Sequence, residues 1–499
     1  MTAAGGTPPL SGGSGGPAAL RPLLDETLDA LAAGARLRGG PVPPGGPAEL
    51  AREVDRVLTG EGPDRHALRR LTELLAYGAA DPADPACAAH LHCPPLAVAV
   101  AADLAVSALN PSQDSWDQAP AATALETALL AELAALVGFP PAAAAGVLTS
   151  GGTESNLMGL MLARDRVLGG AVELDGLPPG RRPRIIASAA AHFSVQRAAA
   201  LLGLGERAVR SVPVDRDQRM DGDALADALA ETVWEGATPI AVVATAGTTD
   251  TGAVDPLGRC ADLAERHGAW LHVDAAYGGG ALLSDRLAPL LDGIARADSV
   301  ALDFHKLGWQ PAAAGVFLVR CEETYASLAR RAVYLNPADD EQAGYPSLLG
   351  LSLRTTRRAD AFKLAVTLRT LGRPGLGALV DACHDLALHA AAAVRAEPAL
   401  DLHGDPLLTT VLFRYRPATD GPDAADRINA ELRRRLLHTG RAVVGRTELP
   451  GTGPGRVRLK LTLLNPHTSP ADIDRLLADI VRQGREVESA PGPSRAAQD

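Results

Sequence analysis

Residues 270–276 read WLHVDAA and residues 298–306 read DSVALDFHK, and these two stretches indicate the fold class. Each is a short apolar run that ends in polar side chains, which predicts a buried strand. Similar runs, with helical patterns between most of them, lie at 146–150, 184–188, 240–246, 299–304 and 315–320. Alternation of strand and helix predicts an α/β fold with a mainly parallel sheet covered by helices. The last two runs are joined by a short loop, so that pair can be antiparallel.

The chain outside this sheet divides into segments of different character. Residues 223–234 place Leu225, Leu229 and Val233 on one helical face, and Asp221 can cap that helix. After residue 371, helical and strand patterns alternate in a smaller α+β domain. We expect a disordered tail, a short helix and a Gly/Pro linker at 1–47, a helical segment at 48–110, a large domain at 111–371, a small C-terminal domain at 372–487 and a loose tail at 488–499.

Composition excludes several classes of function. The net charge of -11, with no basic stripe, argues against nucleic acid as a partner. No run of about 18 apolar residues is apparent, so no membrane partner is expected. The N-terminus lacks a secretory pattern, and five scattered cysteines form no CxxC pair. A reduced, cytoplasmic protein is the expectation.

One cluster near the N-terminal region has metal-binding residue types. His90, His92 and Cys93 could bind zinc, but no second cluster lies nearby in the sequence, so no metal site is predicted. Three other cysteines lie in apolar patterns and are expected in the core: Cys260, Cys321 and Cys383.

A glycine pair marks the first candidate site. A strand ends near Ser150, Gly151 and Gly152 allow a tight turn, and a helix begins after them. Open amides at a helix start bind anions, and glycine permits close approach of a ligand. The turn could hold a phosphate, although a Gly-Gly turn in this position is more often plain turn chemistry.

Two further strand ends carry reactive side chains. Asp274 ends one apolar strand, where it either caps the next helix or needs a buried partner such as a protonated ring nitrogen. His305 and Lys306 follow the next strand. A partly desolvated lysine amine can form an imine with an aldehyde, whereas a lone lysine is usually a surface charge.

Together, these three elements fit one cofactor. Pyridoxal 5′-phosphate (PLP) needs a phosphate site, a lysine for the Schiff base and an acid opposite its pyridine nitrogen. Asp274 and Lys306 are separated by one crossover, so they can lie on neighbouring strands. The sequence therefore predicts a PLP enzyme.

Five motifs carry a resemblance to a known family. They are TSGGTESN at 149–156, AHFSVQRAA at 191–199, VVATAGTTDTGAVDPL at 242–257, WLHVDAAYGG at 270–279 and DFHKLGWQP at 303–311. The chain resembles the PLP-dependent group II decarboxylases over about residues 89–473. This resemblance implies the aspartate-aminotransferase fold (fold type I) and a homodimer whose active sites lie at the subunit interface.

The resemblance also implies roles for individual residues. Lys306 would form the Schiff base and Asp274 would pair with the pyridine nitrogen. Gly152, Thr153 and His305 would bind the phosphate. The remaining cofactor contacts would be made by His192 stacked on the ring, Ala276 on its opposite face and Thr245 near the phenolic oxygen.

Two residues outside these motifs also match family positions. Tyr334, in VYLNP at 333–337, matches the mobile-loop tyrosine that family members use to return a proton to Cα. Lys460 falls where some members bind the substrate carboxylate, although a solvent-facing lysine on an alternating strand is an equal reading.

The substrate class follows from the branch that the chain resembles. Segments at 334–337, 351–358 and 461–466 look most like the diaminobutyrate and lysine branch, which makes diamines for siderophore-type pathways. The expected substrate is thus 2,4-diaminobutyrate, ornithine or lysine, with Asp117 a candidate partner for its second amine. Residues 307–314 depart from that branch, which leaves open an aromatic, acidic or aldehyde-forming relative, or a non-catalytic binding protein of PLP fold.

Overall fold

The computed structural model describes residues 7–59, 63–169, 172–329, 332–418, 421–449 and 453–490. The expected disorder of residues 1–6 and 491–499 therefore lies outside the described residues, whereas the last part of the expected disordered N-terminal segment is helical. The chain forms two compact units, one of residues 95–382 and one that combines residues 1–94 with 383–499. Each unit is built around its own sheet.

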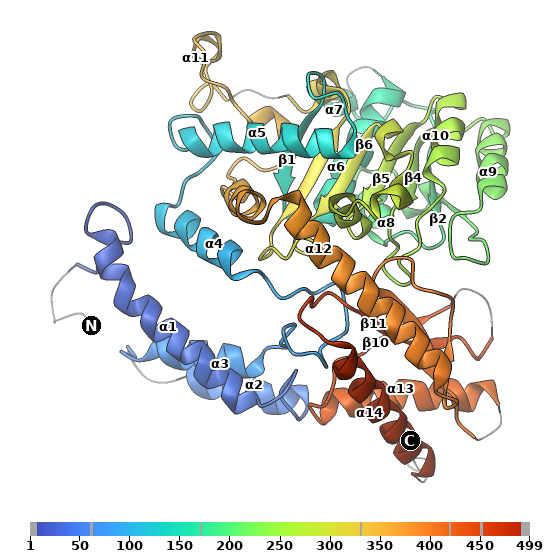
Figure 1. Ribbon diagram of the computed structural model, residues 1–499. Coiled ribbons are helices and arrows are strands. Elements are labelled where there is room, and N and C mark those ends of the chain that lie inside the picture. The colour runs from blue at the N-terminus through green and yellow to red at the C-terminus, as the bar shows by residue number, and fades with distance from the viewer. Residues whose placement is uncertain are drawn as a thin grey trace. The chain divides into compact units, whose positions relative to one another are not determined.

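The larger unit, residues 95–382, contains the predicted α/β sheet (Figure 1). Its seven strands run in the order β1-β7-β6-β5-β4-β2-β3. Their bounds are Ala145–Thr149, Gly315–Val319, Ser299–Asp303, Trp270–Ala275, Thr238–Thr245, Pro183–Ser188 and Val209–Val212 in that order. The mainly parallel sheet is confirmed, and so is the antiparallel pairing of β6 with β7. The short strand β3 was not predicted.

The direction of the strands brings several chain segments to one edge of this sheet. Because β7 is antiparallel to both β1 and β6, those two strands run the same way as β5, β4 and β2. Their carboxyl ends therefore share one edge, which is where open α/β sheets bind ligands. Strands β5, β6 and β7 are buried along their whole length, as expected for strands covered on both faces.

The larger unit also contains α-helices, several of which pack on its sheet. They are α4 (Ala97–Leu109), α5 (Pro120–Val137), α6 (Gly152–Leu168), α7 (Val172–Asp175), α8 (Ser194–Leu201), α9 (Gly222–Trp234), α10 (Leu257–Arg266) and α11 (Ala338–Gln342). Helix α6 packs across β4, β5, β6 and β7. At Gly159 it crosses β5 so closely that a Cβ there would lie 2.6 Å from His272 Nδ1. The predicted cap of α9 is confirmed, because Asp221 accepts hydrogen bonds from the amides of Asp223 and Ala224.

Helix α5 corrects one expectation from the sequence. Among the described residues it is the one helix long and apolar enough to cross a membrane by length and composition, with 18 residues. Its Glu126, however, is buried and pairs with Arg357 at 2.6 Å while it also accepts the Leu148 amide at 3.2 Å. A paired carboxylate and buried leucines are typical of a core helix.

The smaller unit, residues 1–94 and 383–499, has an antiparallel sheet in the order β10-β11-β9-β8. These strands are Gly445–Glu448, Val457–Thr462, Thr410–Tyr415 and Leu400–Leu402. Its helices are α1 (Gly16–Arg38), α2 (Pro47–Leu58), α3 (Ala67–Gly78), α13 (Pro422–His438) and α14 (Pro470–Ser489). The α+β character of the C-terminal region is confirmed, and its apolar core includes Phe413, Leu432, Leu459 and Ile480.

One helix, α12 (Ala361–Ala396), runs from the larger unit into the smaller one. It is broken at Gly372, whose φ of 66° and ψ of 171° are not helical, two residues before Pro374. The element therefore begins before residue 372, where the small C-terminal domain was expected to start. Proline two residues later explains the break, because it cannot donate the backbone hydrogen bond that would continue the helix.

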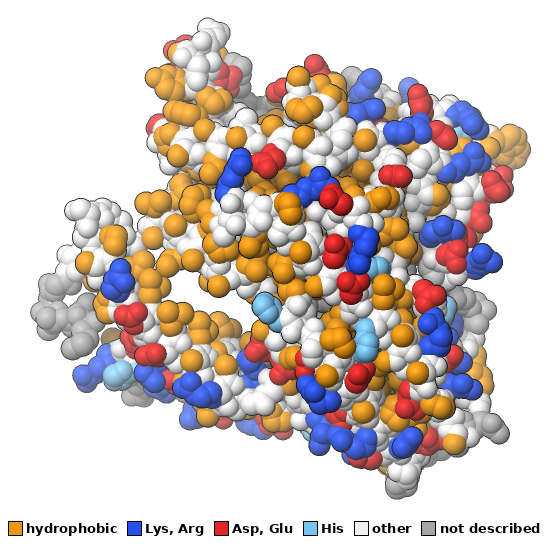
Figure 2. All heavy atoms as spheres, in the orientation of Figure 1, with side chains coloured by type: hydrophobic (Ala, Val, Ile, Leu, Met, Phe, Trp, Pro, Cys, Tyr) orange, Lys and Arg blue, Asp and Glu red, His pale blue; other side chains and the backbone are white. Residues whose placement is uncertain are grey.

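The visible face carries charges of both signs mixed with hydrophobic side chains (Figure 2). None of the five cysteines forms a disulfide bond. Cys260 and Cys383 are buried as predicted, but the prediction for Cys321 was wrong. It is exposed, just after the end of β7, and its Sγ donates to Glu323 at 2.6 Å.

Candidate active site

The glycine turn, residues 150–152, joins β1 to α6. A Cβ on Gly152 would lie 2.9 Å from Ala276 Cβ, and one on Gly151 would lie 3.2 Å from His305 Cε1. Only glycine fits this approach, and Gly151 also has a φ of 152°. The amides that open α6, from Gly152 and Thr153 onward, are thus brought to the strand edge, where they can bind an anion.

Lys306 lies one turn beyond the end of β6. Its Nζ is 3.0 Å from Asp303 Oδ2, and its side chain is 18% exposed. Asp303 is buried, and its Oδ1 has no hydrogen-bond partner among the described residues. The amine is therefore held at the strand edge beside a buried carboxylate while its side chain remains partly exposed.

Asp274 ends β5, the strand next to β6, as the sequence predicted. The carboxylate is buried, with Oδ2 accepting from Asn156 Nδ2 at 2.8 Å and Oδ1 accepting from the Ala276 amide at 3.1 Å. An acid whose oxygens both accept N–H bonds is oriented to receive another cation or N–H donor. The alternative that it caps a helix does not hold, because short 3-10 turns follow β5 and none of their caps uses this side chain.

His192 lies after β2, between the strand and α8. Its Nδ1 is 2.8 Å from Ser194 Oγ and also receives the Ser194 amide at 3.3 Å. Burial lowers the pKa of His192, and the charge of Lys306 lowers it further, against the opposing effect of Asp274 and Asp303. Near neutral pH this imidazole is neutral.

The remaining predicted cofactor contacts lie at the same edge of the sheet. Thr245 ends β4 directly opposite Asp274 in the strand register. Its amide donates to the buried Asp255 at 2.7 Å, and burial raises the pKa of that acid to about 6. His305 Nε2 lies 3.5 Å from Asp303 Oδ2, and burial lowers the pKa of His305.

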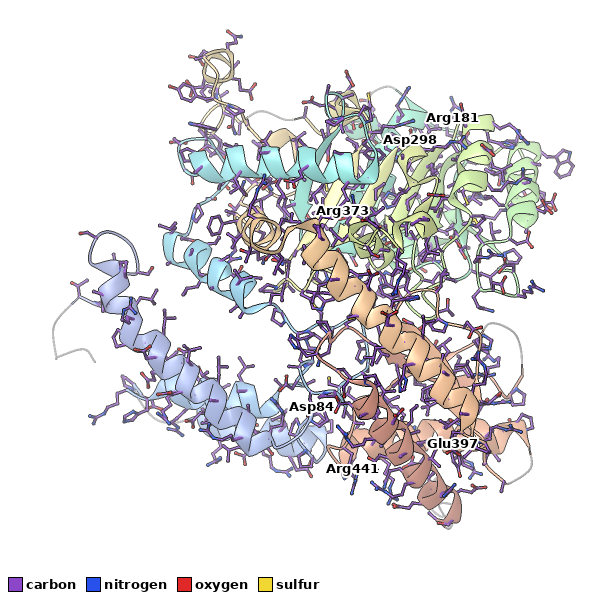
Figure 3. All side chains as sticks on the ribbon, viewed as in Figure 1. Asp84, Arg181, Asp298, Arg373, Glu397 and Arg441 are labelled. Atoms are coloured by element: carbon purple, nitrogen blue, oxygen red, sulfur yellow. The ribbon has the colours of Figure 1, made fainter. Side chains whose placement is uncertain are left out.

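Asp298, which is labelled in Figure 3, shows where the opposite edge of the sheet lies. It precedes β6, and its Oδ2 accepts the Leu271 amide at 2.8 Å. The reactive residues stand at the other end of β6 and its neighbours, so one edge of the sheet carries chemistry and the other carries structural pairs.

Tyr334 is the predicted site residue that does not join this group. It lies in a turn just before α11, is 85% exposed, and makes no hydrogen bond with the described residues. The nearby Asn336 anchors the segment by donating to the Asp114 carbonyl at 3.0 Å. The role of Tyr334 in returning a proton to the substrate stays a prediction.

Lys460 and the His90–Cys93 segment belong to the smaller unit. Lys460 is buried on β11, so the reading of a solvent-facing lysine was wrong. Burial and the charges of Lys460 and Arg433 lower the pKa of His90. Within the described part of the chain, no group of three or more His, Cys, Asp or Glu is placed to hold a metal ion.

Sequence reasoning missed the residues behind the site. Asn156, Ser194 and Asp303 are all buried and bind site residues, yet no role was predicted for them. A signal was present for Asn156, because it lies four residues from both Gly152 and Leu160 on the buried face of α6. A polar side chain on such a face needs partners.

These residues fit PLP. The glycine turn brings the first amides of α6 close to Ala276 and His305, Lys306 offers a partly exposed amine, and Asp274 is a buried acceptor on the adjacent strand. The buried Thr245 Oγ has no hydrogen-bond partner among the described residues, which suits a position beside a polar ligand.

Comparison with known proteins agrees with this geometry. Residues 56–416 match the pyridoxal-dependent decarboxylase conserved domain. The chain is 47% identical over 407 residues to an L-2,4-diaminobutyrate decarboxylase of Rhizobium meliloti (strain 1021), which covers 81% of this chain and 79% of that protein. It is 38% identical over 439 residues to one of Acinetobacter baumannii, with 85% of each chain covered.

A solved structure has the same fold. It is the glutamate decarboxylase domain of the diaminobutyrate-pyruvate transaminase and L-2,4-diaminobutyrate decarboxylase from Vibrio parahaemolyticus. The TM-score is 0.84 at 35% identity, over 96% of this chain and 98% of that one. The site at the edge of the sheet, the matched domain and these relatives lead to one conclusion: the chain belongs to the family of PLP-dependent amino-acid decarboxylases.

Proposed function

We propose that this decarboxylase converts L-2,4-diaminobutyrate to 1,3-diaminopropane and carbon dioxide. The observation that carries the proposal is the 47% identity over 407 residues to an enzyme named for that substrate. Ornithine and lysine are the close alternatives, because they differ from it only in the number of methylene groups. A single methylene changes kcat/KM by roughly 10- to 200-fold, so one member of the series should clearly be preferred.

We assign cofactor binding to residues of the larger unit. Lys306 would hold PLP covalently, and the amides of Gly152 and Thr153, with His305, would hold its phosphate. Ala276 and His192 would contact the ring, and Thr245 would lie near its phenolic oxygen. The support for this assignment is the convergence of these residues at one edge of the sheet.

The chemistry depends on charge placement. Bound PLP supplies an electron sink for the pair left on Cα when CO₂ departs. Asp274, whose carboxylate is buried, would keep the ring nitrogen protonated by pairing with that proton. The site must also hold the carboxylate bond perpendicular to the ring, which is a matter of positioning.

Proton return to Cα is assigned to Tyr334, with His192 as a relay. Tyr334 is 85% exposed and free of hydrogen bonds to the described residues, which suits a residue that acts only when the site closes. The enzyme is proposed to work as a homodimer with active sites at the interface. Light scattering after gel filtration would test this, and a monomer with full activity would contradict it.

We further propose that the enzyme works in the cytoplasm, where its five cysteines, none of which is in a disulfide bond, would stay reduced. The diamine product suits a pathway that builds on two amines, of the siderophore type. Fractionation of the source cells would test the location, and a decarboxylase found outside the cytoplasmic fraction would contradict it.

The direct test of substrate is a product screen with added PLP and a series of L-amino acids: diaminobutyrate, ornithine, lysine, glutamate, aspartate, tyrosine, tryptophan and DOPA. We expect 1,3-diaminopropane as the main product and none from Lys306→Ala. An aromatic or acidic preference would keep the reaction and overturn the substrate.

Asp117 is proposed to bind the second ammonium group of the substrate. Its side chain is exposed, and Oδ1 accepts from Ser115 at 2.5 Å. Asp117→Asn should raise KM for diaminobutyrate by about tenfold with little change in kcat, as expected when binding is lost equally in ground and transition states. An unchanged KM would remove Asp117 from the pocket.

A further inference from the structure

A branched hydrogen-bond chain connects the acid and the histidine of the site through one buried amide. Asn156 Nδ2 donates to Asp274 Oδ2 at 2.8 Å and to Ser194 Oγ at 2.9 Å. Ser194 Oγ in turn lies 2.8 Å from His192 Nδ1. On the other side, Asn156 Oδ1 lies 2.9 Å from His272 Nε2. Asn156 is 1% exposed, so water does not compete for these bonds.

The partners of Asn156 fix which way its amide points. A flipped amide would set its oxygen against the Asp274 carboxylate, two acceptors in contact. Its Oδ1 must therefore face His272, which then carries its proton on Nε2. His272 Nδ1 is left as an acceptor for Ser299 Oγ at 2.8 Å, and Ser299 Oγ accepts from Trp270 Nε1 at 2.8 Å. Each donor in this set of hydrogen bonds thus has one acceptor.

The same logic fixes the proton on His192. Both amide protons of Asn156 are used as donors, so Ser194 Oγ accepts one of them and its own O–H is directed to His192 Nδ1. The Ser194 backbone amide converges on that nitrogen as well. Two donors on Nδ1 leave the imidazole neutral with its proton on Nε2.

We propose that Asn156 is a positioning residue for decarboxylation: it sets His192 as the Nε2–H tautomer through Ser194 and orients the carboxylate of Asp274 through its other amide proton. The proposal rests on the proposed roles of His192 and Asp274. The two side chains that would contact opposite parts of the cofactor are then held by one amide. Loss of Asn156 would therefore affect both branches, whereas loss of Ser194 would affect only the branch to His192.

The charged groups that face His192 are consistent with this arrangement. Lys306 and Arg197 oppose its protonation, whereas Asp274 and Asp303 favour it, and burial outweighs them to lower the pKa of His192. On the other side of Asn156, burial lowers the pKa of His272 to about 4. His272 therefore stays neutral near pH 7 and can donate only from the nitrogen that faces Asn156.

The test uses the full chain without cofactor and with ¹⁵N-labelled histidine. Its signals are followed by NMR against pH, and His192 is identified by its loss in His192→Gln. We expect Nδ1 to be unprotonated and Nε2 protonated in the neutral form. Ser194→Ala should raise the titration midpoint of His192 by about half a pH unit, because a hydrogen bond to the neutral form is lost. An Nδ1–H tautomer, or an unmoved midpoint in Ser194→Ala, would overturn the proposal.

A second readout separates the two branches. Ser194→Ala should leave the Kd for PLP within about twofold of the original value, whereas Asn156→Ala should raise it about tenfold, because only the latter releases Asp274. Equal effects of both variants on PLP affinity would contradict separate branches.

Should Asn156→Ala not fold, the NMR result for Ser194→Ala still decides the proposal. A failed product screen with a normal NMR result would overturn the proposed function and leave this hydrogen-bond arrangement standing.

The control is Asn429→Ala in the smaller unit. Asn429 is equally buried, but its amide bonds only to the backbone, at Tyr415 and Ala425. This variant should lower thermal stability while the His192 titration and PLP affinity stay unchanged. A shift of the His192 midpoint in the control would show that the readout reports general loosening and would overturn the interpretation.

Discussion

The two buried asparagines at positions 156 and 429 have the same side chain and nearly the same burial, yet opposite partners. Asn429 accepts the Tyr415 amide at 2.8 Å and donates to the carbonyls of Tyr415 and Ala425 at 2.9 and 2.8 Å. It joins α13 to β9 through backbone groups alone. Asn156 bonds only to side chains, and two of them titrate. An amide satisfied by backbone fixes a fold, whereas one satisfied by titratable groups also fixes charge and proton positions.

Removing the charge that Asn156 supports should have the largest effect. Asp274→Asn should lower kcat by ~10²–10³-fold, comparable to the loss of one preorganised electrostatic group. The measurement is steady-state kinetics at saturating PLP. The matched acid of the smaller unit is Asp426, which accepts three backbone amides, from Gly455, Arg456 and Val457. Asp426→Asn should lower stability and leave kcat per loaded enzyme unchanged. A similar loss of kcat in Asp274→Asn and Asp426→Asn would contradict the assignment of the chemistry to the larger unit.

The histidine behind Asn156 should make the larger unit sensitive to acid. Burial lowers the pKa of His272 from 6.5 to about 4, so the folded state resists a proton that the unfolded chain accepts. The contribution of neutral His272 to the free energy of unfolding is fully present above pH 6.5. It is lost as the pH falls toward 4, by about 3 kcal/mol in total.

This acid sensitivity is measured by urea unfolding across that pH range. His272→Gln should flatten this part of the profile. His389→Gln, which changes a half-exposed imidazole of the smaller unit, should not. A wild-type profile without a slope between pH 6.5 and 4 would disprove the neutral His272.

Two tightly packed glycines offer a further contrast. Gly152→Ala places a methyl 2.9 Å from Ala276 Cβ at the proposed phosphate site, and Gly484→Ala places one 2.7 Å from the Tyr415 ring in the smaller unit. Overpacking costs about 1–3 kcal/mol in either place. In Gly152→Ala we expect part of this cost to weaken cofactor binding and to raise the Kd for PLP roughly tenfold. In Gly484→Ala it should lower the melting temperature alone. PLP titration by absorbance and thermal unfolding separate the two, and equal PLP affinities would contradict the assignment of the turn.

The smallest difference should be in stability itself. Asn156→Ala and Asn429→Ala each leave buried polar groups without a hydrogen-bond partner. Each should lower the free energy of unfolding by about 1–3 kcal/mol. The two losses should agree within about 1 kcal/mol, although only one variant changes the site. Urea unfolding of the cofactor-free chains measures this. A much larger loss of unfolding free energy in Asn156→Ala would mean that the hydrogen bonds of Asn156 also stabilise the fold.

The large sheet was predictable from sequence because its strands are continuous apolar runs bounded by polar ends. The strands that were missed, β3, β8 and β10, have only three or four residues and partly exposed patterns, so they carry little periodic signal. Cys321 was misplaced for a related reason: it follows a buried strand in the sequence, but the chain has already left the core there.

The site divides in the same way. Lys306, Asp274 and the glycine turn were predictable, because each follows a strand and the strand ends share one edge. Asn156 and Ser194 act through hydrogen bonds between residues 38 and 118 positions apart, which no local pattern records. Tyr334 was predicted by resemblance alone, and the described chain leaves it exposed.

The position of β7 has a consequence for how this enzyme could change over evolution. Asp303, at the end of β6, pairs directly with Gly315, at the start of β7, and a Cβ on Gly315 would meet Gly151 Cα at 2.6 Å. Residues 304–314 therefore form a loop whose base is tied to both the lysine strand and the glycine turn. Within it, the Trp309 carbonyl is fixed by the Leu96 amide at 2.9 Å. Ala312 and Ala313 follow that anchor on the return to β7 and are exposed or partly exposed. We therefore expect that substitutions there can change the surroundings of the site while Lys306 stays in place, so that new specificities arise without rebuilding the chemistry.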